Sequence, residues 1–173
     1  VMGVVSDGGV HGHIHHIQAA VKMLIDQGVE VIIHAITDGR DVAPSSAEGF
    51  MTDLADGLPD KARIGSVIGR YFAMDRDTRW DRVERAYDAM ILGQGAKADT
   101  AIAAIEDAYA QGQTDEFIEP RVIGDYAGVV DGDGVFCLNF RADRAREILS
   151  EIGDPLFDGF ERAKPSLSAL LGM

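Results

Sequence analysis

The segment VIIHAITDGRD (residues 31–41) passes from an almost continuously apolar run directly into Asp38-Gly39-Arg40-Asp41. A β-branched run without polar alternation is typical of a strand that is buried on both faces, as in a parallel sheet covered by helices. We therefore expect a strand over residues 30–37. Open α/β sheets bind ligands at the carboxyl ends of their strands. The charged residues that follow this strand are thus candidates for a ligand site.

Three other apolar runs end in the same way. Residues 1–5 lead into Asp7-Gly8-Gly9-Val10-His11, residues 63–68 lead into Gly69-Arg70 with Arg76 six positions later, and residues 135–140 lead into Arg141-Ala142-Asp143-Arg144. If all four runs are parallel strands, five arginines, a histidine and an aspartate meet at one crevice. Because the chain as a whole is strongly acidic, this arginine excess favours an anionic ligand with more than one charged group.

Apolar residues recur at helical spacing between and after these runs. The helical segments cover residues 14–25, 47–54, 80–91, 102–109 and 145–152. Ser45 or Ser46 can cap the second of them, and Asp99 or Thr100 the fourth. Residues 119–134 are rich in Gly and Asp and predict a loop, with a short hairpin that pairs residues 122–123 with residues 129–130. The alternation predicts an α/β fold, a single three-layer domain with a mostly parallel sheet and helices on both faces.

Composition sets the domain count. A chain of 173 residues that is 46% hydrophobic is long enough for one domain with a real core. We expect this domain over residues 1–154. Residues 155–173 are then a C-terminal tail or a connection, in which Phe157, Phe160 and residues 167–171 either pack back on the core or lead to a further domain. The chain starts within a predicted strand, which is typical of a piece of a longer polypeptide.

Charge and the single cysteine narrow the partners. The net charge of −13 argues against binding to nucleic acid or to an acidic membrane surface. No apolar stretch approaches the roughly 20 residues that cross a bilayer, and no signal peptide is visible. Cys137 lies alone within an apolar run, which predicts a buried core residue and agrees with a reducing compartment. We therefore expect a cytoplasmic protein.

Arginine is the main candidate for ligand binding, because its planar guanidinium group matches the geometry of phosphate and carboxylate. The strand-end positions favour ligand contact for Arg40, Arg70, Arg76, Arg141 and Arg144. A surface ion-pair network is the better interpretation for Arg79, Arg82 and Arg85, which lie among acidic neighbours.

Asp41 has two interpretations. Its carboxylate can act as a general base for a substrate hydroxyl, or it can serve as a helix cap or as a partner of Arg40. Asp7 and Asp38 can hold their loops through hydrogen bonds from nearby backbone N–H groups.

The histidine run from His11 to His16 has two interpretations as well. His11 and His15 have the i, i+4 spacing of metal ligands on a helix, but no third ligand is spaced nearby. An imidazole that contacts an anion is the better prediction for His11, and capping or packing is better for His13 and His16. We therefore predict no metal site in this chain.

The strand-end motifs together resemble the cofactor-independent phosphoglycerate mutases. The resemblance rests on SDGGVH (residues 6–11), DGRD (residues 38–41), GRYFAMDRD (residues 69–77) followed by RWDR (residues 79–82), and NFRADR (residues 139–144). All four motifs occur in the family's order, and the resemblance runs from Val1 to at least Ile152. Members of this family have a phosphatase-like domain, with two Mn²⁺ ions and a transiently phosphorylated serine, and an inserted domain that binds phosphoglycerate. The chain resembles only the inserted domain.

The resemblance implies roles for individual residues. Phosphoglycerate, or the glycerate intermediate, would contact His11, Arg40, Asp41, Arg70, Arg76, Arg141 and Arg144. Asp41 would be catalytic and handle the glycerate hydroxyl proton while the phosphoryl group moves to and from the serine. The whole enzyme would interconvert 3-phosphoglycerate and 2-phosphoglycerate. The two Mn²⁺ ions would lie in the phosphatase-like domain of the same chain, so the inserted domain alone would need no cofactor and would be inactive.

Two alternatives remain open at this point. One is a free-standing metal-dependent hydrolase that uses His11 and His15. The other is a non-catalytic module that binds phosphosugars.

Overall fold

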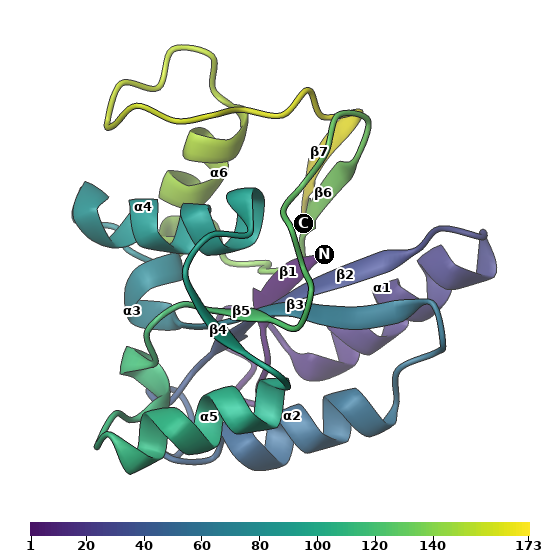
Figure 1. Cartoon of the computed structure of the whole chain (residues 1–173), viewed down its shortest axis with the longest axis vertical. Coiled ribbons are helices and arrows are strands. Elements are labelled where there is room, and N and C mark those ends of the chain that lie inside the picture. The colour runs from purple at the N-terminus through teal and green to yellow at the C-terminus, as the bar shows by residue number, and fades with distance from the viewer.

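A computed structural model describes all residues, 1–173, and shows one sheet between two layers of helices (Figure 1). The seven strands lie in the order β4-β5-β3-β2-β1-β6-β7. Their bounds are Met2–Val4 (β1), Val31–Thr37 (β2), Ala62–Gly69 (β3), Ala96–Ala98 (β4), Arg121–Ile123 (β5), Gly134–Cys137 (β6) and Ala169–Gly172 (β7). The predicted three-layer α/β domain is confirmed.

The four apolar runs form the parallel centre of the sheet. β1 pairs with β2 and with β6, and β2 pairs with β3, all in parallel. Their carboxyl ends therefore share one edge, as predicted. β6 ends at Cys137, three residues before the predicted end of this strand, so the NFRADR segment begins in irregular structure.

Helices cover both faces of the sheet. One layer holds α1, α2 and α5, and the other holds α3, α4 and α6 (Figure 1). A π-helical turn, η1, continues α4. The bounds are Ile14–Asp26 (α1), Ala47–Asp56 (α2), Arg70–Ala73 (α3), Trp80–Tyr87 (α4), Asp88–Leu92 (η1), Ala101–Ala110 (α5) and Arg146–Gly153 (α6). Two short 3₁₀ turns are Asp115–Phe117 (η2) and Ala142–Arg144 (η3). None of the helices is both long and apolar enough to span a bilayer.

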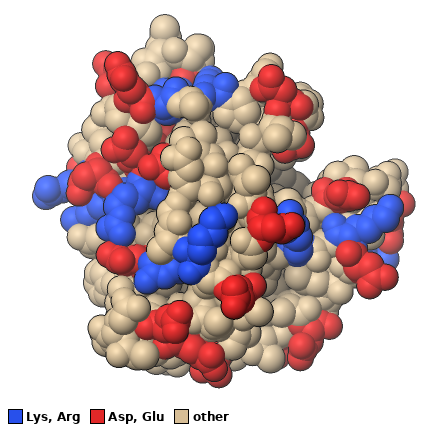
Figure 2. Space-filling view, viewed as in Figure 1, with Lys and Arg blue, Asp and Glu red and all other residues tan.

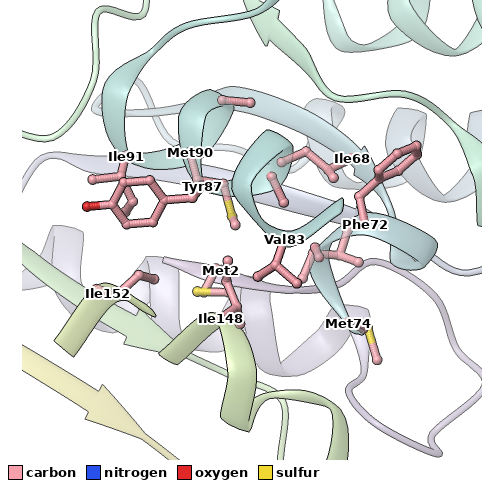
Figure 3. Close-up of a cluster of buried hydrophobic side chains, with 14 of the residues drawn as sticks. Met2, Ile68, Phe72, Met74, Val83, Tyr87, Met90, Ile91, Ile148 and Ile152 are labelled. Carbon is pink, nitrogen blue, oxygen red and sulfur yellow. The ribbon is translucent and has the colours of Figure 1, made fainter. Parts of the chain in front are cut away.

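Each face of the sheet has its own apolar core. On one face Ile33 and Val67 of the strands pack with side chains of α1, α2 and α5. On the other, Met2 and Ile68 pack with side chains of α4, η1 and α6, including the fully buried Tyr87 (Figure 3). Neighbouring residues of β2 and β3 thus face opposite cores, which is why these runs show no polar alternation. Cys137 is buried and free, as predicted.

The predicted hairpin in residues 119–134 is wrong. Val122 and Ile123 do lie in a strand, β5, but β5 pairs antiparallel with β3 and parallel with β4. Both strands that pair with β5 are thus more than twenty residues away in sequence, and the local residue pattern of the loop does not predict such distant pairing. β5 is the single antiparallel neighbour of the central strands.

The N-terminus of α2 is capped by a residue from a remote segment. Ser46 occupies the capping position, as predicted, but its side chain makes no capping hydrogen bond. Instead, Asp115 Oδ2 accepts hydrogen bonds from the backbone N–H groups of Ser46 (2.8 Å) and Ala47 (2.9 Å). Thr100 caps α5 through its own side chain, as predicted. The remote cap fixes η2 against the start of α2, beside the DGRD turn.

Residues 155–173 return to the sheet. Phe160 and Leu167 pack against the core on the α4 side, and β7 pairs in parallel with β6. Phe160 and Leu167 thus pack back on the core, whereas Leu170 and Leu171 of β7 remain exposed. The boundary at residue 154 stays a prediction.

Gly39 is expected to tolerate alanine poorly. Its φ is +66°, and a Cβ there would lie 2.7 Å from Asp115 Cβ and 2.8 Å from the Glu116 backbone nitrogen. We expect Gly39→Ala to lower the free energy of unfolding by about 2–4 kcal/mol, from backbone strain plus overpacking. Gly28→Ala is the control, because Gly28 has φ +81° but nothing within 4 Å of the added Cβ, so strain alone should cost about 1 kcal/mol. Urea unfolding measures both, and equal losses would contradict the close contact.

Candidate functional site

Arg70 is the buried centre of the strand-end site. It is the first residue of α3, directly after β3, and is only 3% exposed. Its Nη1 donates to Asp38 Oδ1 (2.6 Å) and to Asp41 Oδ2 (2.6 Å). Burial alone would lower the pKa of Arg70, but hydrogen bonds to Asp41 and Asp38 outweigh burial and raise it. The guanidinium group therefore keeps a fixed positive charge that joins two strand-end loops.

Asp38 organises the DGRD turn from within. Its carboxylate accepts hydrogen bonds from the Ser6 hydroxyl (2.7 Å) and from the backbone N–H groups of Arg40 (3.3 Å) and Asp41 (3.1 Å). Burial alone would raise the pKa of Asp38, but these donors, together with Arg70, lower it. The predicted structural role of Asp38 is thus confirmed.

Asp41 pairs with Arg70, not with Arg40. Its side chain is 20% exposed, whereas Asp38 is almost fully buried. The buried Asp38 therefore stabilises the turn from the protein interior. Asp41 reaches the surface of the site, where a ligand hydroxyl can approach. The role of Asp41 as a general base stays a prediction.

Arg40 extends from the same turn toward solvent. Its Nη1 lies 3.3 Å from Glu116 Oε1, and its side chain is 57% exposed. An exposed pair of this kind adds little stability, so a ligand anion can replace Glu116 at low cost. Sequence reasoning missed Glu116, because it lies 76 residues away in a segment with no motif.

Asp143 joins the remaining strand-end loops. Its carboxylate lies 3.2 Å from Arg76 Nη1, 3.0 Å from Arg141 Nε and 3.8 Å from His11 Nδ1. Asp143 lies within the NFRADR motif, but nothing in that motif indicated contacts of its carboxylate with other loops. The loops after β1, β3 and β6 thus meet at one acidic side chain.

Arg144 is held by the backbone and repelled by its neighbours. Its Nη1 donates to the Met74 carbonyl oxygen (3.0 Å). Burial lowers the pKa of Arg144, and the positive charges of Arg76, Arg70 and Arg40 lower it further. Asp143 acts in the opposite direction, so the repulsion among these guanidinium groups is only partly offset, which favours the binding of an anion between them.

The structure brings all seven predicted site residues together, but with acidic partners. Five arginines are accompanied by four carboxylates, those of Asp38, Asp41, Glu116 and Asp143. The local excess of positive charge is thus smaller than the sequence alone indicates. Over the visible face, basic and acidic side chains likewise interleave (Figure 2). The placement of the guanidinium groups, rather than a broad positive field, is therefore what distinguishes this edge of the sheet.

The histidine run does not converge on a metal. No group of three or more His, Cys, Asp or Glu side chains in the chain is arranged to hold a metal ion. His13 caps α1 by accepting from the His15 backbone N–H (3.2 Å), and His16 packs edge-on against Phe140. The predicted capping and packing roles of His13 and His16 are confirmed, and the hydrolase alternative is not favoured.

Known proteins resemble this chain over its whole length. The family described as BPG-independent PGAM N-terminus (iPGM_N) matches residues 1–173. The 2,3-bisphosphoglycerate-independent phosphoglycerate mutases of Agrobacterium fabrum and Paracoccus denitrificans are 65% and 62% identical to it. In each case all of the chain is aligned, but only 34% of the relative. The chain therefore spans about a third of the length of these relatives.

A solved structure shows the same fold. The crystal structure of Leishmania mexicana phosphoglycerate mutase at low cobalt concentration superposes with a TM-score of 0.92 and 32% sequence identity. The alignment covers 99% of this chain and 34% of that one. On the family match and these relatives together, the chain belongs to the N-terminal family of the 2,3-bisphosphoglycerate-independent phosphoglycerate mutases.

Proposed function

We propose that this chain is the substrate-binding domain of a phosphoglycerate mutase. The whole protein interconverts 3-phosphoglycerate and 2-phosphoglycerate through a phosphoserine that lies outside these 173 residues. The observation that carries the proposal is the meeting of five guanidinium groups with Asp41 and His11 at one sheet edge, in a chain that belongs to this family.

The chemistry of phosphoglycerate suits this arrangement. The substrate carries a phosphate, a carboxylate and a hydroxyl group, so it needs several cations and one proton acceptor. The partly exposed Arg40, Arg76 and Arg141 bind the two anionic groups, and the buried Arg70 holds Asp41 in place. Asp41 takes and returns the glycerate hydroxyl proton as the phosphoryl group leaves and arrives. Several fixed cations keep glycerate bound while it turns between the two transfers.

The remaining machinery belongs to the rest of the protein. The described residues offer no set of three metal ligands, so the two Mn²⁺ ions that the family resemblance implies do not fit this chain. We place them, with the nucleophilic serine, in a phosphatase-like domain of the same polypeptide. By itself the domain binds phosphoglycerate weakly and catalyses no transfer. We also propose a cytoplasmic location for the whole enzyme.

Binding of 3-phosphoglycerate tests the proposal. Arg141→Ala is expected to weaken binding to this chain by about 10- to 150-fold, because one charge-assisted contact is worth about 1.5–3 kcal/mol. Arg63→Ala is the matched control: it removes the same charge from the opposite end of β3, where Arg63 pairs with Asp125. Isothermal titration calorimetry measures both variants.

Two outcomes would contradict the proposal. Equal affinity in the Arg141 and Arg63 variants would show that the site is elsewhere. Binding without mutase activity in the longer protein would instead favour a phosphosugar-binding module.

A further inference from the structure

His11 and Asp143 each hold a buried polar atom that no hydrogen bond satisfies, and the two atoms lie near each other. His11 is only 5% exposed, and its Nδ1 has no hydrogen-bond partner. The Asp143 side chain is 33% exposed, but its Oδ1 atom is shielded from solvent and makes no hydrogen bond, at 3.8 Å from that nitrogen. Such atoms are rare in folded proteins and call for an explanation.

The other neighbours of Asp143 do not supply one. Arg141 Nε lies 3.0 Å from Oδ1 and forms an ion pair with it, but its N–H points away from Oδ1, so the ion pair does not supply a hydrogen bond. Arg76 Nη1 bonds to the other oxygen, Oδ2. A carboxylate among the cations of an anion site cannot itself bind the anion. Asp143 therefore needs a role that acts through a neighbour.

We propose that Asp143 is a positioning residue for His11. When ligand occupies the site, the gap closes by about an ångström to the length of an ordinary hydrogen bond, and His11 Nδ1–H donates to Asp143 Oδ1. The other ring nitrogen, Nε2, then faces the ligand. The chemical nature of that ligand rests on the proposed function.

The pairing decides what His11 can recognise. The groups that act on His11 are Arg70, Asp143, Arg141 and Asp41. Burial lowers the pKa of His11, and Arg70 lowers it further, while Asp143 acts in the opposite direction. The ring is therefore neutral near pH 7. With its proton on Nδ1, Nε2 is an acceptor, so His11 recognises a hydroxyl group of the ligand rather than an anionic oxygen.

The first test measures the pKa of His11 directly. NMR titration without ligand compares the pKa of His11 in the wild-type chain and in Asp143→Asn. The His11 signal is identified as the one that disappears in His11→Gln. The pKa of His11 is expected to fall further in Asp143→Asn, because the nearest negative charge is gone. Asp26→Asn is the control: it removes one charge at the far end of α1, where Asp26 pairs only with Lys22. An unchanged pKa in Asp143→Asn would overturn the pairing.

The second test uses ligand affinity, where charge and positioning predict opposite results. If Asp143 acts only through its charge, its removal from a cation cluster tightens anion binding. If it positions His11, Asp143→Ala weakens 3-phosphoglycerate binding roughly tenfold, the effect of about one hydrogen bond. The loss should largely vanish for 3-(phosphonooxy)propanoate, which lacks the hydroxyl. Tighter binding of both ligands would overturn the proposal, with circular dichroism showing that the variants fold.

The two tests separate this inference from the proposed function. If neither the wild-type chain nor any variant binds 3-phosphoglycerate, the proposed function fails. The pKa of His11 then still decides whether the two side chains interact.

Discussion

Arg70→Ala is expected to lower the free energy of unfolding by about 3–5 kcal/mol, because it leaves buried charge without a partner. Arg70 and Asp38 are both 3% exposed, and one guanidinium nitrogen joins Asp38 to Asp41. Without it, two carboxylates lie close together with no cation between them. Phosphoglycerate binding should be lost at the same time, since Asp41 is no longer held. Urea unfolding and calorimetry measure the two effects.

The pH dependence of this loss identifies its cause. The pKa of Asp38 is lowered in the folded chain, so Asp38 contributes stability that is present above its unfolded pKa of about 3.9 and is lost as the pH falls through the folded pKa. The difference between Arg70→Ala and the unchanged chain should therefore be largest at neutral pH and shrink below about pH 4. Arg70→Lys is the control, because lysine keeps the positive charge but not the planar guanidinium group, whose Nη1 donates to both carboxylates. A loss that is independent of pH would point to packing instead.

Asp41→Asn is expected to reduce kcat of the longer mutase by about 10²–10⁴-fold, the range for loss of a general base. Asparagine has nearly the same shape and still accepts a hydrogen bond from Arg70, so folding and the KM for phosphoglycerate should change little. The reason for the loss is chemical: a neutral amide cannot take the glycerate hydroxyl proton.

Steady-state kinetics in both directions measure this effect. Asp7→Asn is the control, since Asp7 is an exposed carboxylate on the neighbouring strand-end loop and should leave kcat within a few-fold. A kcat near that of the unchanged enzyme in Asp41→Asn would remove Asp41 from the chemistry and leave it the supporting role that it shares with Asp38.

The central sheet and the basic half of the site could be predicted from sequence, for a local reason. Each of the four central strands lies in an apolar run that leads directly into its own loop residues, so the same few positions predict both the strand and the site. Parallel pairing then fixes which ends of the strands meet. For this reason the sequence predicts that Arg40, Arg70 and Arg141 lie at the same edge of the sheet, although they are far apart in the chain.

The acidic half of the site could not be predicted in this way. Glu116 and Asp115 lie in η2, a single 3₁₀ turn without periodicity, and they act on residues 68 to 76 positions away. Asp143 lies within a motif, but two of its three partners, His11 and Arg76, lie on other strand-end loops. The edge strands β4 and β7 are only three and four residues long and are mostly exposed, so neither stands out in the sequence as a buried strand.

The remote cap of α2 bears on the order in which the chain folds. The first turn of α2 depends on a carboxylate that is synthesised 68 residues later. While the chain is still emerging from the ribosome, the backbone N–H groups of Ser46 and Ala47 have only water as a partner. We therefore expect hydrogen exchange on a refolding chain to show the amides at the start of α2 protected late, together with the η2 turn, and after the β1–β2–β3 centre has formed.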